Sequence, residues 1–141
     1  MSEAAHHLAS VRRRLAGMLY ESLLLLGVLS ALVLLPNLIV GVIWQVAMPG
    51  WALWVNVALA AGLYFVYQWH RNGQTLALKT WRIRIVTSAD GQPPSITRAL
   101  FRYLLAWPSV LSVVGLLWAL IDRDRQFLHD RLSGTRIISV P

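Results

Sequence analysis

The stretch SLLLLGVLSALVLLPNLIVGVIW, residues 22–44, contains no charged side chain. The uncharged region continues beyond it, because no Asp, Glu, Lys or Arg lies between Glu21 and His70. About 20 consecutive apolar residues are enough to span the hydrocarbon core of a bilayer. We therefore expect an integral membrane protein with a first spanning helix over about residues 15–35 and a kinked or tilted continuation beyond Pro36.

Two further apolar segments follow, over about residues 52–69 and 103–121. Trp residues gather around the Met48–Trp51 turn, as they do at membrane–water interfaces. The third segment has ample residues for one full span, and few for the alternative, a short hairpin that breaks near Pro108 or Gly115. The sequence therefore predicts two or three transmembrane helices, with the third apolar segment either spanning or re-entrant.

Two short runs, Trp81–Val86 and Thr135–Val140, have the composition and alternation of β-strands. A lone strand leaves its backbone groups unpaired, so we expect these runs to pair with each other on one side of the membrane. The predicted fold class is an all-α membrane protein with a small cytoplasmic two-strand β element. That element is drawn from a polar loop, 70–102, and a charged C-terminal segment, 122–141, within a single domain covering residues 1–141.

The composition excludes several classes of protein. The chain is 57% hydrophobic and only 13% charged, which is about half the charged fraction of a soluble domain. Its net charge of +7 comes from Arg residues that flank apolar runs, so the expected partners are the lipid bilayer and its anionic headgroups, and not nucleic acid. Because the chain has no Cys, it has neither a disulfide nor a thiolate metal site.

The Arg residues also predict an orientation, since positive charge near membrane spans favours the cytoplasm. Arg12, Arg13 and Arg14 precede the first span, and the loop 70–102 is also basic. We therefore expect a cytoplasmic N-terminus. The basic segment 122–141 would lie outside if the third apolar segment crossed once, and this conflict favours a hairpin that returns to the cytoplasmic side.

Glu21 is the sharpest candidate for a functional residue, because it lies inside an apolar helix. A charged side chain at the bilayer centre costs about 2.5–3.5 kcal/mol, so such a group faces a partner or a water-filled path. One interpretation is a carboxylate that binds a cation or relays a proton. The other is a structural ion pair with Arg14, which lies two helical turns earlier on the same face, or with Arg102.

His129 and Asp130 invite a catalytic or metal-binding interpretation, which their spacing does not support. Adjacent residues of a helix point about 100° apart, and zinc requires three or four converging ligands. We therefore expect no enzyme, no cofactor and no metal. Asp122 and Asp130 are instead expected to pair with Arg residues in a clasp at headgroup level, and His129 to bond a backbone carbonyl.

Several motifs of this chain resemble those of the RDD family of small membrane proteins. The first is Arg14-Leu-Ala-Gly-Met-Leu-Tyr-Glu21, where the family usually has Asp at the last position. The second is Gly73-Gln-Thr-Leu-Ala-Leu-Lys79 with the strand Ile83–Val86 and the turn Asp90-Gly91, and here Ala77-Leu78 replaces a Gly-Lys pair. Arg102 and the closing Leu128-His-Asp-Arg-Leu-Ser-Gly-Thr-Arg-Ile-Ile138 complete the pattern.

The resemblance implies a helical membrane domain, usually drawn with three spans. It also implies a transport-related role, including cation/proton exchange, and two or three spans would need a homo-oligomer or another membrane protein to complete a path. The alternative is an accessory or assembly factor that docks other membrane proteins through its cytoplasmic face, 72–98 and 122–141. The expected location is the bacterial inner (plasma) membrane.

Overall fold

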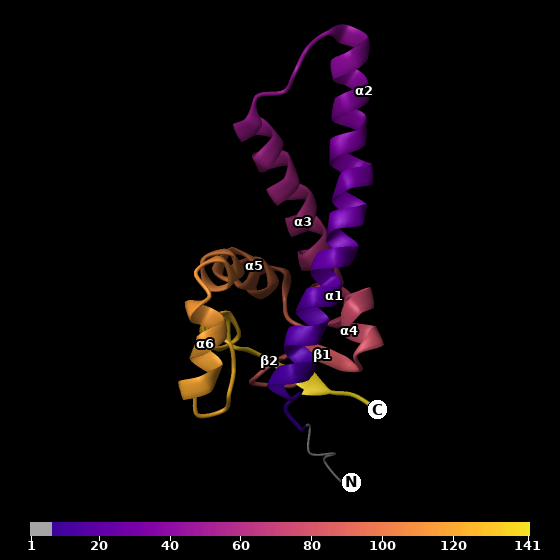
Figure 1. Ribbon diagram of the computed structural model, residues 1–141. Helices are drawn as coiled ribbons and strands as arrows, with labels where there is room; N and C mark the ends of the chain where they lie inside the picture. Colours follow the sequence, from indigo (N-terminus) through magenta and orange to yellow (C-terminus); the bar gives the residue numbers. More distant parts are fainter. Residues whose placement is uncertain (1–6) are drawn as a thin grey trace.

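The first helix of the protein is longer than a bilayer is thick. In the computed structural model, which describes residues 7–141, it consists of α1 (Val11–Leu29), the π-helical segment η1 (Ser30–Leu34) and α2 (Leu35–Trp44) (Figure 1). Its 34 residues extend about 51 Å at ~1.5 Å per residue, whereas the hydrocarbon core is ~30 Å thick. The predicted span 15–35 lies wholly inside this helix.

The π-helical segment η1 accommodates Pro36, which has no N–H to donate. The amide of Leu35 reaches back five residues to the carbonyl of Ser30. The side-chain amide of Asn37 donates to the carbonyl of Val33 at 2.7 Å. The helix therefore continues past proline with its neighbouring carbonyls bonded, as the interior of a membrane requires.

The second long helix, α3 (Gly50–Asn72), returns beside the first and extends the predicted span 52–69 at both ends. It ends at Gly73, whose φ of +67° is in the left-handed region. A Cβ at Gly73 would collide with the carbonyl oxygen of Ile85, and the Ile85 amide donates to the Gly73 carbonyl at 2.8 Å. Only glycine allows the chain to turn this closely beneath the strand.

The two predicted strands are present and pair with each other. After the short helix α4 (Leu76–Thr80), β1 (Ile83–Thr87) runs antiparallel to β2 (Thr135–Ser139). The N-terminal segment joins them, because Ser139 donates to the carbonyl of His7 at 2.9 Å and Ala9 donates to that of Ile137 at 3.0 Å. Segments from both ends and the middle of the chain thus meet at one end of the long helices (Figure 1).

The third apolar segment is bent and does not form one straight helix. It consists of α5 (Ile96–Leu111) and α6 (Val114–Ile121), which meet at 91°. The break is at Ser112 and Val113, between the two predicted positions; Pro108 lies within α5. Beyond α6 come α7 (Leu128–Leu132) and β2, so the segment ends at the same end of the molecule where it began.

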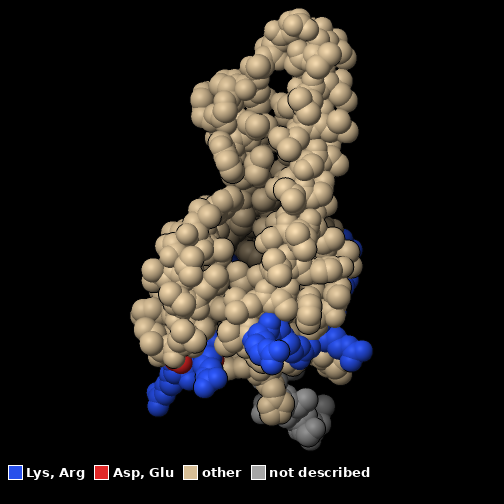
Figure 2. Space-filling model, in the orientation of Figure 1, with Lys and Arg blue, Asp and Glu red and all other residues tan. Residues whose placement is uncertain are grey.

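The buried core lies where the sheet meets the helices. Ile83 and Ile85 of β1 are 0% and 2% exposed, and they pack with Trp69 of α3 and Tyr103 of α5. The upper parts of α1–α2 and α3 instead carry exposed apolar side chains, with no charged residue on the face in Figure 2. Lys and Arg gather at the opposite end (Figure 2). This distribution suits a protein whose long helices lie in lipid and whose sheet lies near the headgroups.

Candidate functional site

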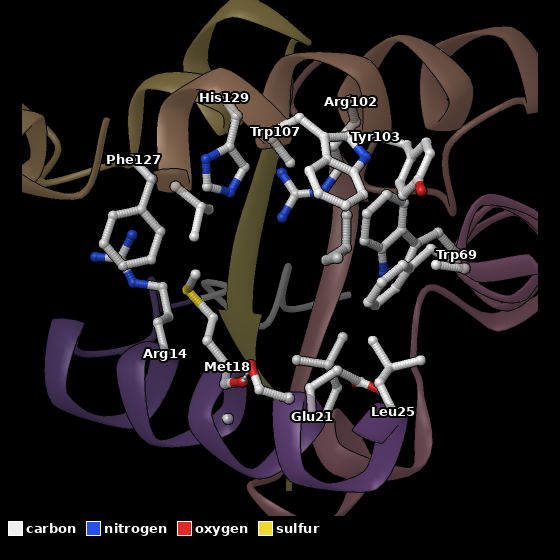
Figure 3. Close-up of a pocket in the computed structure, with 18 of the residues that line it drawn as sticks. Arg14, Met18, Glu21, Leu25, Trp69, Arg102, Tyr103, Trp107, Phe127 and His129 are labelled. Atoms are coloured by element: carbon white, nitrogen blue, oxygen red, sulfur yellow. Dashed lines mark hydrogen bonds between the residues drawn. The ribbon is translucent and has the colours of Figure 1, made fainter. Parts of the chain in front are cut away.

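A cavity of about 320 Å³ lies between α1, α3 and α5, with the sheet and α7 closing one end (Figure 3). Four of the residues singled out from the sequence line it: Arg14, Glu21, Arg102 and His129. The rest of the lining is almost entirely apolar or aromatic. Ionisable groups in such surroundings mark functional sites in membrane proteins.

Glu21 is 7% exposed and is held by two hydroxyl groups. Tyr64 of α3 donates to its Oε1 at 2.9 Å, and Thr75, the N-cap residue of α4, donates to its Oε2. No Lys, Arg or His lies within salt-bridge distance of Glu21 among residues 7–141. The ion pair with Arg14 or Arg102 that was one of the two interpretations is therefore not formed.

Arg14 points to a different part of the cavity. Its Nη2 donates to the carbonyl of Arg125, and its guanidinium lies 4.9 Å from the centroid of the Phe127 ring. Arg14 is only 3% exposed. Although Arg14 and Glu21 share a face of α1, the guanidinium of Arg14 donates its hydrogen bond to the loop between α6 and α7 and not to Glu21.

Arg102 of α5 pairs with Asp130 of α7 rather than with Glu21. Its Nη1 also donates to the hydroxyl of Thr135 at 3.1 Å, and its guanidinium lies 5.0 Å from the centroid of the Trp69 ring. Figure 3 shows Arg102 projecting towards the middle of the cavity from α5. Asp130 is fully buried behind it, so this pair joins the α5–α6 segment to the start of the final strand.

His129 also lines the cavity, but its partner is not the backbone carbonyl we expected. Its Nδ1 lies 3.0 Å from Oγ of Ser109, and its ring stacks on Phe127. Burial, followed by the positive charges of Arg102 and Arg14, lowers the pKa of His129 to about 2. The imidazole is therefore neutral at physiological pH.

Asp122 lies outside the cavity, in the charged loop after α6, where Arg131 pairs with Asp122 and Asp124. Its carboxylate accepts from Nε of Arg131 at 2.5 Å and from the amide of Gln126 at 3.1 Å. The hydrogen bond from Arg131 is the main reason that the pKa of Asp122 is lowered to about 2. Arg131 also contacts Asp124 at 3.0 Å. Asp122 thus shapes the loop that reaches Arg14 and does not touch the cavity itself.

Within residues 7–141, no three His, Asp or Glu side chains lie close enough together to hold a metal ion. Four residues that contact Glu21, His129 or Arg14 were not predicted from the sequence: Tyr64, Thr75, Ser109 and Phe127. A signal for Thr75 was present in the Gly73–Lys79 motif, since Thr is a preferred N-cap residue. Tyr64 carried no such signal, because its partner is 43 residues away.

Comparisons with known proteins point to one family. The model of the RDD family matches residues 8–134. An uncharacterised protein of Haemophilus influenzae is 33% identical over 108 residues, which cover 69% of this chain and 67% of that protein. An uncharacterised protein of Rickettsia prowazekii is 30% identical over 77 residues, which cover 53% of this chain and 42% of the relative. No solved structure matches the chain.

Proposed function

The chain belongs to the RDD family, and from this premise we propose that it has a transport-related role in which Glu21 takes up and releases a proton or a monovalent cation. The observation that carries the proposal is the setting of Glu21: a buried carboxylate that lines a cavity and accepts from two hydroxyls, with no cation paired to it among the described residues.

The chemistry of this setting suits reversible binding. A carboxylate and two hydroxyl oxygens are hard ligands of the kind that alkali and other hard cations prefer. The hydroxyls of Tyr64 and Thr75 now donate to Glu21. A hydroxyl also has two acceptor lone pairs, so each can rotate and offer its oxygen to a bound cation. A proton on Glu21 and a cation beside it would then compete for the same carboxylate.

Transport by this chain requires more than one copy or a membrane partner. Two helices are long and apolar enough to cross a membrane, and the bent α5–α6 segment would return to its starting side. Two spanning helices cannot enclose a path on their own. We therefore include a homo-oligomer, or a complex with another membrane protein, in the proposal.

The proposed location is the bacterial inner membrane, with the end that carries the sheet in the cytoplasm. The support for this orientation is the band of Lys and Arg at that end and its absence from the far tips of the long helices on the face in Figure 2. The N-terminus and the C-terminal strand would both be cytoplasmic, because residues 7–9 pair with β2.

The test is reconstitution of the protein into liposomes that contain a proton-sensitive dye. An outward or inward cation gradient should drive proton movement with the wild type and not with Glu21→Gln. The matched control is Asp90→Asn, since Asp90 is an exposed carboxylate in the turn after β1 and lies away from the cavity. Absence of cation-dependent proton flux in the wild type, or full flux in Glu21→Gln, would contradict the proposal.

A second candidate function is that of an accessory or assembly factor, which is the alternative that the sequence left open. The observation in its favour is the basic surface around the sheet, which could receive an acidic partner (Figure 2). Cross-linking in intact membranes would decide between the two. Recovery of one constant membrane complex, together with no ion flux from the purified protein, would favour the accessory role.

A further inference from the structure

Arg14 and Arg102 are buried guanidinium groups that leave most of their hydrogen-bond donors unused. Each is 3% exposed. A guanidinium has five N–H donors. Within residues 7–141, Arg14 donates only from Nη2, to a backbone carbonyl, and Arg102 donates only from Nη1. Nε of both residues is buried without a partner. Buried donors of this kind are costly unless something binds them.

The charges of the two groups are also unequally compensated. Asp130 neutralises Arg102. No carboxylate lies within salt-bridge distance of Arg14 among residues 7–141, and its nearest compensation is the more distant charge of Asp122. The carboxylate of Glu21 has both oxygens bonded to hydroxyls. Among the described residues, the part of the cavity near Arg14 therefore carries a positive charge with no carboxylate in contact.

The rest of the cavity is lined mainly by apolar side chains. From Arg14 its lining follows α1 as far as Leu29, a rise of about 22 Å at ~1.5 Å per residue. Beyond Ser22 the walls are apolar and come from three helices: Leu25, Leu29, Val57, Val110 and Leu111. Figure 2 shows the hollow opening between the long helices and the α5–α6 segment. The site thus has one cationic end and one long apolar side, which opens between the long helices and the α5–α6 segment.

We propose that this cavity binds a single-chain amphipathic anion, with its acidic head at the unused donors of Arg14 and Arg102 and its acyl chain between α1 and α5. A fatty acid carboxylate and the phosphate of a lysophospholipid share this chemistry. The neutral imidazole of His129 and the ring of Phe127 lie on the Arg14 side of the cavity, and the ring of Trp69 lies against Arg102 on the other side (Figure 3). These rings would exclude water around the bound head. Charge-assisted hydrogen bonds of guanidinium to either head would satisfy donors that are now unpaired.

This inference goes beyond the proposed function, because it assigns a ligand to the guanidinium groups and not to Glu21. It does not require proton or cation movement. Glu21→Gln removes a carboxylate from the same cavity, so it should bind the anion at least as tightly as the wild type, even where that variant has lost proton flux. If proton flux is absent but the anion binds, this inference stands and the proposed function fails. If the anion does not bind but proton flux is present, the proposed function stands and this inference fails.

The test uses the full chain in detergent and measures bound ligand by native mass spectrometry, with thermal unfolding as a second readout. The probes are oleate, oleoyl lysophosphatidate and, as a neutral probe with the same chain, oleyl alcohol. We expect one bound anion per chain and binding at least about tenfold weaker for the alcohol. Binding of oleate alone identifies a carboxylate ligand, and binding of lysophosphatidate alone identifies a phosphate ligand. Equal affinity for the alcohol would overturn the inference.

Three variants localise the binding. Arg14→Gln removes a guanidinium that pairs with no carboxylate of residues 7–141, and it should weaken anion binding at least about tenfold. Arg12→Gln removes the same charge from an exposed position two residues earlier, and it should leave binding unchanged. Ala106→Phe should fill the acyl channel and weaken all three probes. Unchanged oleate and lysophosphatidate binding in both Arg14→Gln and Ala106→Phe would show that the ligands lie elsewhere on the apolar surface.

Discussion

Arg102 of α5 and Asp130 of α7 form an ion pair from which water is excluded, with side chains that are 4% and 0% exposed. The two residues are 28 positions apart, on either side of the bent α5–α6 segment. Their pairing brings the end of that segment back to its beginning. It also places the neighbouring His129 against the cavity, so one contact organises both the fold of the third apolar segment and the cationic end of the site.

Removing one partner of this pair should strongly destabilise the protein. Asp130→Asn would leave the Arg102 charge buried without a counter-charge, and we expect a loss of about 3–5 kcal/mol in the free energy of unfolding. Denaturant unfolding in detergent, followed by Trp fluorescence, measures this change. The control is Asp124→Asn, whose partner Arg131 has a side chain that is 41% exposed, and we expect little or no loss of stability from it. Similar losses for the two variants would contradict a structural role for the buried pair.

Stability should fall in acid because His129 is held neutral. The folded-state pKa of His129 is lowered to about 2, whereas an unfolded histidine titrates near 6.5. The unfolded state therefore binds more protons, and stability is complete above pH ~6.5 and decreases as the pH falls below it. The loss is about 2 kcal/mol at pH ~5.

Unfolding experiments between pH ~7 and ~5 measure this slope. His129→Asn retains a polar side chain opposite Ser109 but does not titrate, so its slope should be shallower than that of the wild type. A wild-type slope in His129→Asn would mean that another group is responsible.

Gly115 should not tolerate a larger residue. Its Cα packs against Ser109 across the bend between α5 and α6, and a Cβ at this position would overlap the Ser109 side chain. We expect Gly115→Ala to cost about 1–3 kcal/mol through overpacking. Gly27→Ala is the control, because nothing lies within 4 Å of a Cβ there, and alanine should stabilise α1 by up to about 1 kcal/mol. Thermal unfolding of the two variants in detergent should therefore give shifts of opposite sign.

The C-terminal strand should lie on the same side of the membrane as the N-terminus. Because the chain has no Cys, Pro141→Cys and Gly50→Cys each introduce a single thiol, two residues after β2 and at the start of α3. A membrane-impermeant thiol reagent added to intact cells should label Gly50→Cys and not Pro141→Cys. Labelling of Pro141→Cys from outside would show that the third apolar segment crosses the membrane.

The sequence carried most of the architecture because the relevant signals are local or compositional. The uncharged region from Ser22 to Trp69 is long enough for two spanning helices and the turn between them, whatever the rest of the chain does. Each of the two β-prone runs needed a partner strand for its backbone hydrogen bonds, and this need correctly indicated that the two runs pair with each other. The position of the bend in 103–121 was not readable, because Val113 adopts a left-handed conformation that neither Pro108 nor Gly115 signals.

The candidate site was only partly readable for a different reason. Composition identified Glu21 and Arg14 as unusual in an apolar helix, and their spacing placed them on one face. It could not choose their partners, because those come from elements that the chain reaches much later: Tyr64 and Thr75 for Glu21, and the loop before α7 for Arg14. The sequence by itself therefore determined that buried charges exist in this membrane protein. Only the tertiary structure decided which groups satisfy them and which donors remain free, since hydrogen bonds depend on distances of a few ångströms between residues far apart in the chain.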